Sequence, residues 1–360
     1  MRKSVVRAGL GAAGCLAALA AIPGGARPAV GEIEWSIERD GSVRDASRVQ
    51  LTVETRWTRS SNSTWSNDRP IGELQGLSPA QVIGAGGPVR FAIVREAGRL
   101  DCAGAAGHFR GKGKCSFTPD AGFSSFLQAK GIGQPNVQDS YSLTMSGVGR
   151  ELVEAMGTIG YARPNVDQLV AMGIHGVSAD YVRGLSQSGY RLKSADDLVA
   201  FRIHAVSIDY LRELAAAGPR LRNLAAADVV SMRIHGVEPN YVRELAAIGP
   251  AFQQLTADNL VAFRIHGADP SMVRAFAAYT RGPLDADDVV AMAIHGVTAA
   301  YIEEMGRLGY RGLTADELVS MRIHGVEPSY VRELQRAGIA SLSADQLVRL
   351  RLSGFSPSNR

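Results

Sequence analysis

Histidine is the residue type in this sequence whose side chain and regular spacing could together form a chemical site. It recurs in an Ile-His-Gly-Val motif, or a close relative of it, in steps of 29, 31, 31, 29 and 29 residues: His175, His204, His235, His266, His295 and His324. Six imidazoles in register could form a metal ladder, because imidazole is a common metal ligand. Equivalent helices in a stack lie about 8–10 Å apart, whereas a zinc–nitrogen bond is only about 2 Å long. Neighbouring histidines could not easily share an ion, so we expect neither a metal nor another cofactor.

The motif places each histidine at the end of a short helical stretch. No glutamate follows any of the six, so the metallopeptidase motif HExxH is absent. We predict that each imidazole caps its helix, either by bonding exposed carbonyl groups or by packing against the tyrosine of the next unit. Metal binding, pH sensing and catalysis are the alternatives.

The histidine motif belongs to a longer repeat. Steps of 29 residues outward from the six histidines reach Ser146 and Ser353, so the motif has eight copies whose terminal members deviate, as expected at the ends of a stacked array. The typical first helix begins with a capping residue and ends at a glycine, as at Thr314 and Gly325. Helices this short are not stable alone. Residues 121–360 are therefore predicted to form an α-solenoid of two-helix repeats, with about 29–31 residues per repeat.

Arginine also recurs in register. Five arginines share one position in the second helix of their units: Arg183, Arg212, Arg243, Arg274 and Arg332. They could bind a partner, such as an anionic polymer of the cell envelope, or form a ladder of Arg–Glu ion pairs between units. Residues 121–360 hold 23 basic and 24 acidic side chains, and this balance favours the ladder.

Residues 1–26 are predicted to be a cleaved signal peptide. Basic residues at 2–7 precede an apolar run at 8–22, and small residues suit cleavage after Ala26. The apolar run is shorter than the roughly 20 residues of a membrane span. An uncleaved anchor and a lipoprotein acylated at Cys15 are the alternatives. No other stretch is long and apolar enough to cross a membrane, so we expect a periplasmic or secreted protein with no stable membrane span after cleavage.

Residues 27–120 are predicted to form a small antiparallel β-rich domain. Apolar and polar residues alternate in three segments, at 33–37, 49–53 and 89–93. Such alternation is typical of strands with one buried face and one solvated face. The polar tract 58–68, which includes Trp65, is expected to be a loop or hairpin tip. Ser78, followed by proline, is expected to cap a short helix.

The same region contains Cys102 and Cys115, which flank a glycine-rich stretch that is typical of a hairpin. Export would place both cysteines in an oxidising compartment, and a disulfide closing this loop contributes about 3 kcal/mol in the chain-entropy model. A reactive or metal-binding pair is disfavoured, because the two cysteines lack the CxxC spacing and His108 is the only histidine between them. The predicted fold class is thus α+β in two domains, a disulfide-linked β-rich domain followed by an α-solenoid.

Composition argues against a nucleic-acid partner. Only 6% of residues are aromatic, and four of the basic residues behind the net charge of +4 lie within residues 1–27. The segment Ile-His-Gly-Val-Glu-Pro is similar to a helix-hairpin-helix of DNA-binding proteins. However, Glu238 and Glu327 stand where that hairpin needs a second glycine, and their carboxylates would repel a phosphate.

The unit Leu-Val-x-Met-Arg-Ile-His-Gly-Val-x-Pro-x-Tyr-Val-Arg-Glu-Leu resembles the helical repeats appended to some bacterial antirepressor-type sensor metallopeptidases and found in related stand-alone exported proteins. The resemblance covers residues 121–360. It implies an envelope protein linked to sensing. Peptidase activity does not carry over, because the chain has neither the HExxH motif nor the several membrane spans of those peptidases.

These patterns predict a non-enzymatic exported cell-envelope protein whose repeat array is a scaffold for protein partners. One alternative is a sensor or regulatory module that works with a membrane signalling protein. Another is an enzyme of unrecognised type in the β-rich domain, for which Asp101, His108 and Lys112 are the nominal candidates.

Overall fold

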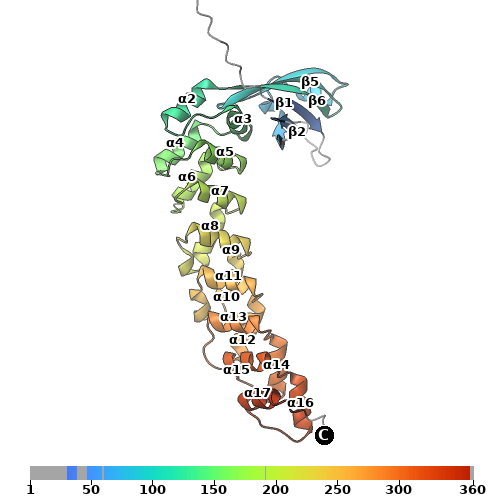
Figure 1. Cartoon of the computed structure of the whole chain (residues 1–360), viewed down its shortest axis with the longest axis vertical. Helices are drawn as coiled ribbons and strands as arrows, with labels where there is room; N and C mark the ends of the chain where they lie inside the picture. Colours follow the sequence, from blue (N-terminus) through green and yellow to red (C-terminus); the bar gives the residue numbers. More distant parts are fainter. Residues whose placement is uncertain (1–30, 39–46, 59–60, 191, 357–360) are drawn as a thin grey trace, which may run out of the picture.

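The computed structural model describes residues 31–38, 47–58, 61–190 and 192–356 (Figure 1). The predicted signal peptide, with Cys15 and the cleavage site at Ala26, lies outside these ranges. A six-stranded antiparallel sheet is followed by a stack of short helices, which confirms the predicted α+β fold class. The stack is long and bowed, and the sheet projects sideways from its N-terminal end (Figure 1). None of the described helices is long and apolar enough to cross a lipid bilayer.

The sheet follows the predicted alternation. Its strands are β1 (Glu32–Glu38), β2 (Arg48–Arg56), β3 (Asn62–Pro70), β4 (Gly87–Arg95), β5 (Gly98–Gly107) and β6 (Arg110–Pro119). Their order in the sheet is β3-β2-β1-β6-β5-β4. The three segments predicted from alternation lie in β1, β2 and β4. Their apolar residues, among them Trp35, Leu51 and Phe91, are buried in one core.

The prediction of a loop at 58–68 is wrong for most of that tract. From Asn62 onward it forms β3, an edge strand in which Trp65 lies opposite Val53 of β2. No residue of β3 is fully buried, so its sequence lacks the alternation that marks a half-buried strand. Among the described strands β3 pairs with β2 alone, and its outer edge leaves backbone N–H and C=O groups without a neighbouring strand.

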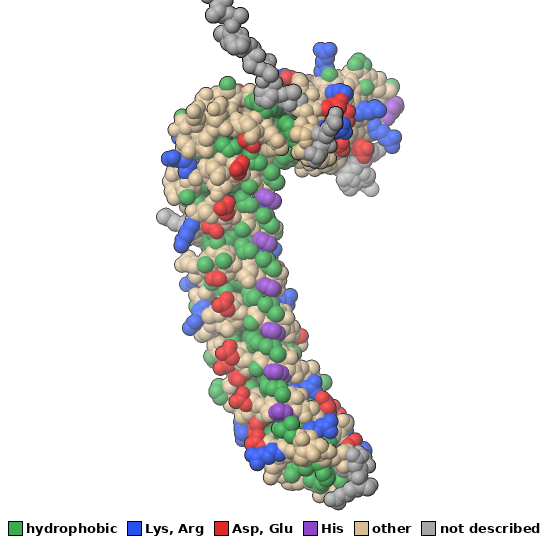
Figure 2. Space-filling view, in the orientation of Figure 1, with side chains coloured by type: hydrophobic (Ala, Val, Ile, Leu, Met, Phe, Trp, Pro, Cys, Tyr) green, Lys and Arg blue, Asp and Glu red, His purple; other side chains and the backbone are tan. Residues whose placement is uncertain are grey.

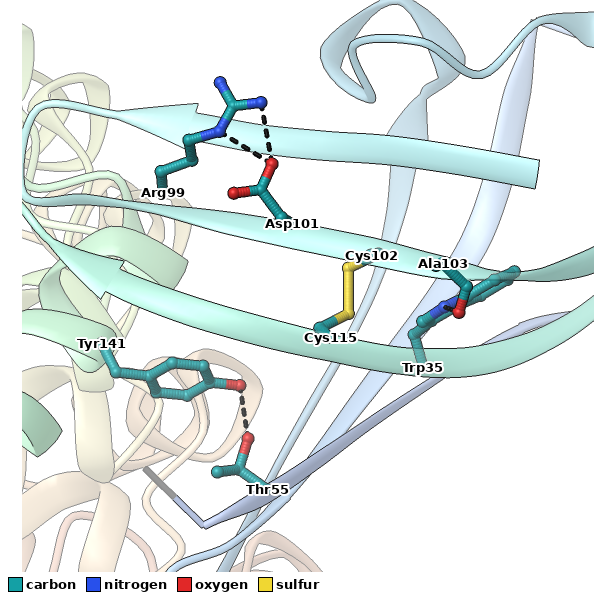
Figure 3. Close-up of a disulfide and its surroundings, with 8 residues drawn as sticks. All are labelled: Trp35, Thr55, Arg99, Asp101, Cys102, Ala103, Cys115 and Tyr141. Carbon is teal, nitrogen blue, oxygen red and sulfur yellow. Dashed lines mark hydrogen bonds and ion pairs between the residues drawn. A yellow bond between two sulfur atoms is a disulfide. The ribbon is translucent and has the colours of Figure 1, made fainter. Parts of the chain in front are cut away.

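Two local predictions for the sheet region are confirmed. Ser78 caps helix α1 (Pro79–Ile83) and forms a reciprocal capping box with Gln81. Cys102 and Cys115 form a disulfide between directly opposite positions of β5 and β6, with their Cα atoms 4.0 Å apart (Figure 3). The disulfide therefore reinforces a hairpin in the middle of the sheet.

Helix α3 (Val137–Ser146) joins the sheet to the helical stack. Its Tyr141 is buried in the core of the sheet, where the ring packs edge-on against Trp57 and Phe117. The Tyr141 oxygen accepts a 2.7 Å hydrogen bond from the Thr55 hydroxyl (Figure 3). Burial raises the pKa of Tyr141 to about 12, so its hydroxyl stays neutral at physiological pH.

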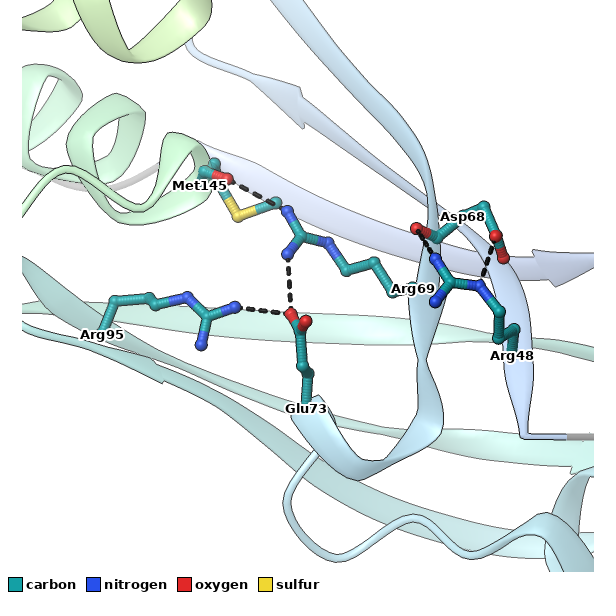
Figure 4. Close-up of polar contacts among 6 residues, drawn as sticks. All are labelled: Arg48, Asp68, Arg69, Glu73, Arg95 and Met145. Carbon is teal, nitrogen blue, oxygen red and sulfur yellow. Dashed lines mark hydrogen bonds and ion pairs between the residues drawn. The ribbon is translucent and has the colours of Figure 1, made fainter. Parts of the chain in front are cut away.

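Arg69 of β3 ties the same helix to the sheet. Its guanidinium donates to the Met145 carbonyl oxygen over 3.1 Å and pairs with Glu73, in the turn η1 (Ile71–Glu73), which also pairs with Arg95 (Figure 4). Burial alone would raise the pKa of Glu73, but the two guanidinium groups lower it overall. The sheet and the stack thus share both an apolar core and a charged network.

The helical stack consists of two-helix units, preceded by α2 (Ala121–Ala129). The first helices of the eight units are α3, α5 (Val166–Ile174), α7 (Ala195–Ile203), α9 (Ala226–Ile234), α11 (Ala257–Ile265), α13 (Ala286–Ile294), α15 (Ala315–Ile323) and α17 (Ala344–Leu352). The second helices of the first seven units are α4 (Arg150–Ile159), α6 (Ala179–Gln187), α8 (Ile208–Ala217), α10 (Pro239–Ala246), α12 (Pro270–Tyr279), α14 (Ala299–Arg307) and α16 (Pro328–Arg336).

The first helices contact one another along one side of the stack and the second helices do so along the other (Figure 1). A continuous apolar core runs between the two columns. The two 31-residue steps contain the additional 3-10 turns η2 (Pro219–Leu221) and η3 (Pro250–Gln254), so these insertions fall between units.

Each first helix is closed by a residue with left-handed backbone, in the position after the histidine or serine. Seven of the eight are glycines, with φ between 67° and 75°: Gly147, Gly176, Gly236, Gly267, Gly296, Gly325 and Gly354. The eighth is Ala205, with φ of 53°. A left-handed conformation costs an L-residue roughly 1–2 kcal/mol, so the unit around His204 carries local strain.

Replacing this alanine should therefore stabilise the protein. We expect Ala205→Gly to raise the free energy of unfolding by about 0.5–1 kcal/mol, because relief of strain exceeds the extra entropy of glycine in the unfolded chain. Urea unfolding followed by circular dichroism measures the change. Ala200→Gly, inside α7, is the matched control and should destabilise by about 1 kcal/mol. A lower midpoint for Ala205→Gly would contradict the left-handed cap.

Candidate interaction surface

Successive units are joined by a contact between a tyrosine and an arginine. The tyrosine, in a second helix, donates its hydroxyl hydrogen to the backbone carbonyl two residues after the motif histidine or serine of the next unit, over 2.6–3.1 Å. The arginine of that next unit lies over the tyrosine ring, 4.6–5.1 Å from its centre. The pairs are Tyr181–Arg202, Tyr210–Arg233, Tyr241–Arg264, Tyr301–Arg322 and Tyr330–Arg351.

The two partners of this contact are present or absent together. At the two remaining junctions the equivalent positions hold Leu152 with Gly173, and Met272 with Ala293. No junction has a tyrosine in the first position without an arginine in the second, or the reverse. A cation–π contact needs both groups, so the five junctions that contain it use the tyrosine and the arginine as one element.

The five arginines considered for partner binding lie mostly in ion pairs. Three reach a glutamate of the preceding unit, as the ladder hypothesis predicts: Arg183 with Glu151 (2.7 Å), Arg243 with Glu213 (3.7 Å) and Arg332 with Glu304. Arg212 pairs with Asp209 of its own helix. Within the described residues no acidic group pairs with Arg274. Exposed pairs of this kind contribute little stability, and they leave no uniform cationic stripe on the array.

The motif histidines are the C-cap residues of the first helices α5, α7, α9, α11, α13 and α15. Their backbone carbonyls take part in the contacts between units. Arg202, Arg233 and Arg264 each donate to the carbonyl oxygen of the motif histidine in the preceding unit, over 3.3–3.4 Å. Arginine, not imidazole, lies over the five tyrosine rings, so the packing of imidazole on tyrosine stays a prediction. In the described structure no hydrogen bond of an imidazole occurs, and no group of three or more His, Cys, Asp or Glu is arranged to hold a metal ion.

The residue before each motif histidine, together with the one before Ser353, forms an exposed apolar column. Its members are 52–63% exposed: Ile174, Ile203, Ile234, Ile265, Ile294, Ile323 and Leu352. In the described chain only two other large apolar side chains are exposed, and both less so: Ile83 (40%) and Tyr279 (46%). Figure 2 shows the histidines in one line along the array, with apolar side chains beside them. We call this column, with its adjoining histidines, the Ile–His band.

The band begins at a groove between the sheet and the array. The groove has a volume of about 860 Å³ and is lined on one side by β3, including Trp65 and Asp68, and on the other by α3 and α5, including Met145 and Ile174. Ile174 belongs to both the groove and the band. The two surfaces are therefore continuous, and the sheet marks the N-terminal end of the band.

The three nominal enzyme candidates do not form a common site. His108 lies in the turn between β5 and β6, and Lys112 lies opposite Ala105. Asp101 is four residues before Ala105 on β5, about 13 Å away at the rise of a strand. It pairs with Arg99 over 2.8 Å (Figure 3).

Compared with models of known protein families and with curated proteins, the sequence matches none. The function is therefore inferred from the surface of the protein. The Ile–His band was not among the sites predicted from the sequence. The available signal was an excess of apolar positions in the first helices: in α7, Leu198 and Phe201 are fully buried, while Ile203 is 53% exposed and cannot belong to the same face.

Proposed function

We propose that this chain is a non-enzymatic exported protein of the cell envelope, periplasmic or secreted, whose repeat array is a scaffold for protein partners. The observation that carries the proposal is the Ile–His band, a column of seven exposed apolar side chains in register along the array. Monomeric soluble proteins rarely expose contiguous apolar surface of this kind unless another molecule covers it.

Two further features support the envelope setting. The disulfide between Cys102 and Cys115 suits an oxidising compartment. The signal peptide predicted at residues 1–26 would direct the chain to such a compartment. The resemblance of the repeat unit to those of antirepressor-type sensor metallopeptidases and related exported proteins agrees with this setting. The alternative of a regulatory module acting with a membrane signalling protein would use the same band to meet that protein.

The test compares capture by the full-length mature protein and by a band variant. We expect Ile203→Ser, Ile234→Ser and Ile265→Ser together to reduce the amount of a specific envelope protein retained at least tenfold. Each side chain would contribute about 1 kcal/mol to binding by burying its exposed half. Because the three are already open to water, unfolding should change by only about 0.5 kcal/mol per substitution.

Ile83→Ser with Tyr279→Ser is the matched control, since these are the exposed large apolar residues outside the band. This control should retain the captured protein. Equal capture by the wild type and the band variant would overturn the proposal that the band is the scaffold surface.

A further inference from the structure

The Ile–His band has an acidic column along one side. The second residue of six first helices is an exposed aspartate: Asp167, Asp196, Asp258, Asp287, Asp316 and Asp345. Each lies seven residues before the band residue of its helix. Seven residues are nearly two turns, so both side chains share one helix face. Figure 2 shows acidic side chains in a line parallel to the histidines.

The acidic column has no internal counter-charge. Within the described residues no lysine or arginine forms an ion pair with any of its six aspartates. The capping boxes of these helices use the N-cap residue before the helix and the residue after the column: Asp285 is the N-cap of α13, and its backbone N–H donates to the Asp288 carboxylate. The column itself takes no part in the capping box. Burial raises the pKa of Asp288, and the charges of Asp285, Asp316 and Asp287 add to the effect, so the carboxylates of adjacent units repel one another.

The opposite side of the band differs. The arginines two residues before the motif histidines lie over tyrosine rings, and Arg233 and Arg322 also pair with Glu238 and Glu327. Over the described units the band is therefore apolar in the middle and has, along one side, carboxylates that no lysine or arginine pairs with. A partner that covers it must supply apolar groups and, beside them, cations on that side.

We propose that the Ile–His band docks a cationic amphipathic α-helix of another protein, aligned with the long axis of the array. The inference rests on the proposed scaffold function and names the partner's chemistry. First helices of adjacent units pack directly, which spaces band residues about 8–10 Å apart. Seven residues of an α-helix span about 10.5 Å, which is close to that spacing, so over a few units one apolar residue per two turns meets one band residue per unit. Lysine or arginine beside that apolar row meets the acidic column.

The test uses the full-length mature protein and three synthetic 28-residue peptides. The first has leucines on one helical face and lysines along one side of that face. The second replaces lysine with glutamate, and the third places a proline in the middle of the first. Fluorescence anisotropy at low and physiological salt gives the Kd values. We expect the lysine peptide to bind at least tenfold more tightly than either other peptide, and to weaken with salt.

Protein variants locate the site. The triple variant Asp258→Asn, Asp287→Asn and Asp316→Asn should raise the Kd of the lysine peptide about tenfold. The variant Ile203→Ser, Ile234→Ser and Ile265→Ser should do the same. The charge-matched control is Asp180→Asn, Asp209→Asn and Glu303→Gln, which changes exposed acids of the second helices and should leave Kd unchanged. Equal effects of the two acidic triples would overturn the proposal, as would equal binding of the lysine and proline peptides.

Two results would refute this inference while leaving the scaffold proposal intact. One is an envelope protein whose capture depends on the band although the lysine peptide fails to bind. The other is a concentration-dependent dimer in analytical ultracentrifugation that the Ile→Ser variant abolishes, because the occupant would then be a second copy of this chain. Loss of both peptide binding and band-dependent capture would remove the two proposals together.

Discussion

Tyr141→Ala is expected to lower the free energy of unfolding by about 4 kcal/mol and to uncouple the sheet from the helical stack. Large-to-small replacements of buried aromatic residues cost roughly 3–5 kcal/mol, and this ring fills the core between Trp57 and Phe117. All three tryptophans, Trp35, Trp57 and Trp65, lie in the sheet region. Tryptophan fluorescence therefore reports on the sheet, and circular dichroism at 222 nm reports on the helices. In urea the fluorescence transition should move to lower concentration much further than the helical one.

The hydrogen bond at this joint can be separated from the packing. Tyr141→Phe leaves the buried Thr55 hydroxyl without its partner and should cost about 1–2 kcal/mol. Adding Thr55→Val removes the stranded hydroxyl and should recover most of that loss. If Tyr141→Ala shifted both transitions by the same small amount, α3 would not be the element that couples the two parts.

Tyr241→Ala should break the array at one junction and cost about 3–4 kcal/mol. The ring is 8% exposed, its hydroxyl donates to the Ala268 carbonyl over 2.7 Å, and the Arg264 guanidinium lies 5.0 Å from its centre. Burial raises the pKa of the Tyr241 hydroxyl, so it remains a donor throughout the neutral range. In a stack where each unit contacts only its neighbours, one weakened interface divides the cooperative unit. Calorimetry should show the helical transition broaden or split.

The chain provides a matched control for this prediction. Tyr241→Met with Arg264→Ala reproduces the pair found at Met272 and Ala293. The double variant should cost clearly less than the sum of its two single variants, because each single variant leaves the other partner without its contact. Additive losses in this cycle would contradict the view that the tyrosine and arginine act together.

The regular parts of the fold could be predicted from the sequence because local chemistry determines them. Alternation predicted β1, β2 and β4, and capping residues predicted α1 and the repeat helices. The edge strand β3 could not be predicted in this way. It buries no residue fully, so its strand conformation depends on pairing with β2 rather than on a periodic pattern of its own.

The surface was harder to predict than the fold. The arginine ladder was one of two stated hypotheses, and three pairs between units, such as Arg183 with Glu151, agree with it. The repeated histidine draws attention because imidazole can do chemistry. The more informative position is the residue before it, such as Ile265, because that residue is apolar and yet exposed. Sequence periodicity places Ile265 on a helix but does not say which helices lie against it. Only the packed array shows that this position is left open.

The paired tyrosine and arginine also bear on how such an array evolves. A tandem duplication copies whole units, and each unit contributes an arginine to the junction before it and a tyrosine to the junction after it. Met272 and Ala293 belong to different units, yet they meet at the same junction. The pair is therefore a property of the junction between two units and not of either unit alone. An alignment of the copies one by one separates the two partners and would hide their pairing.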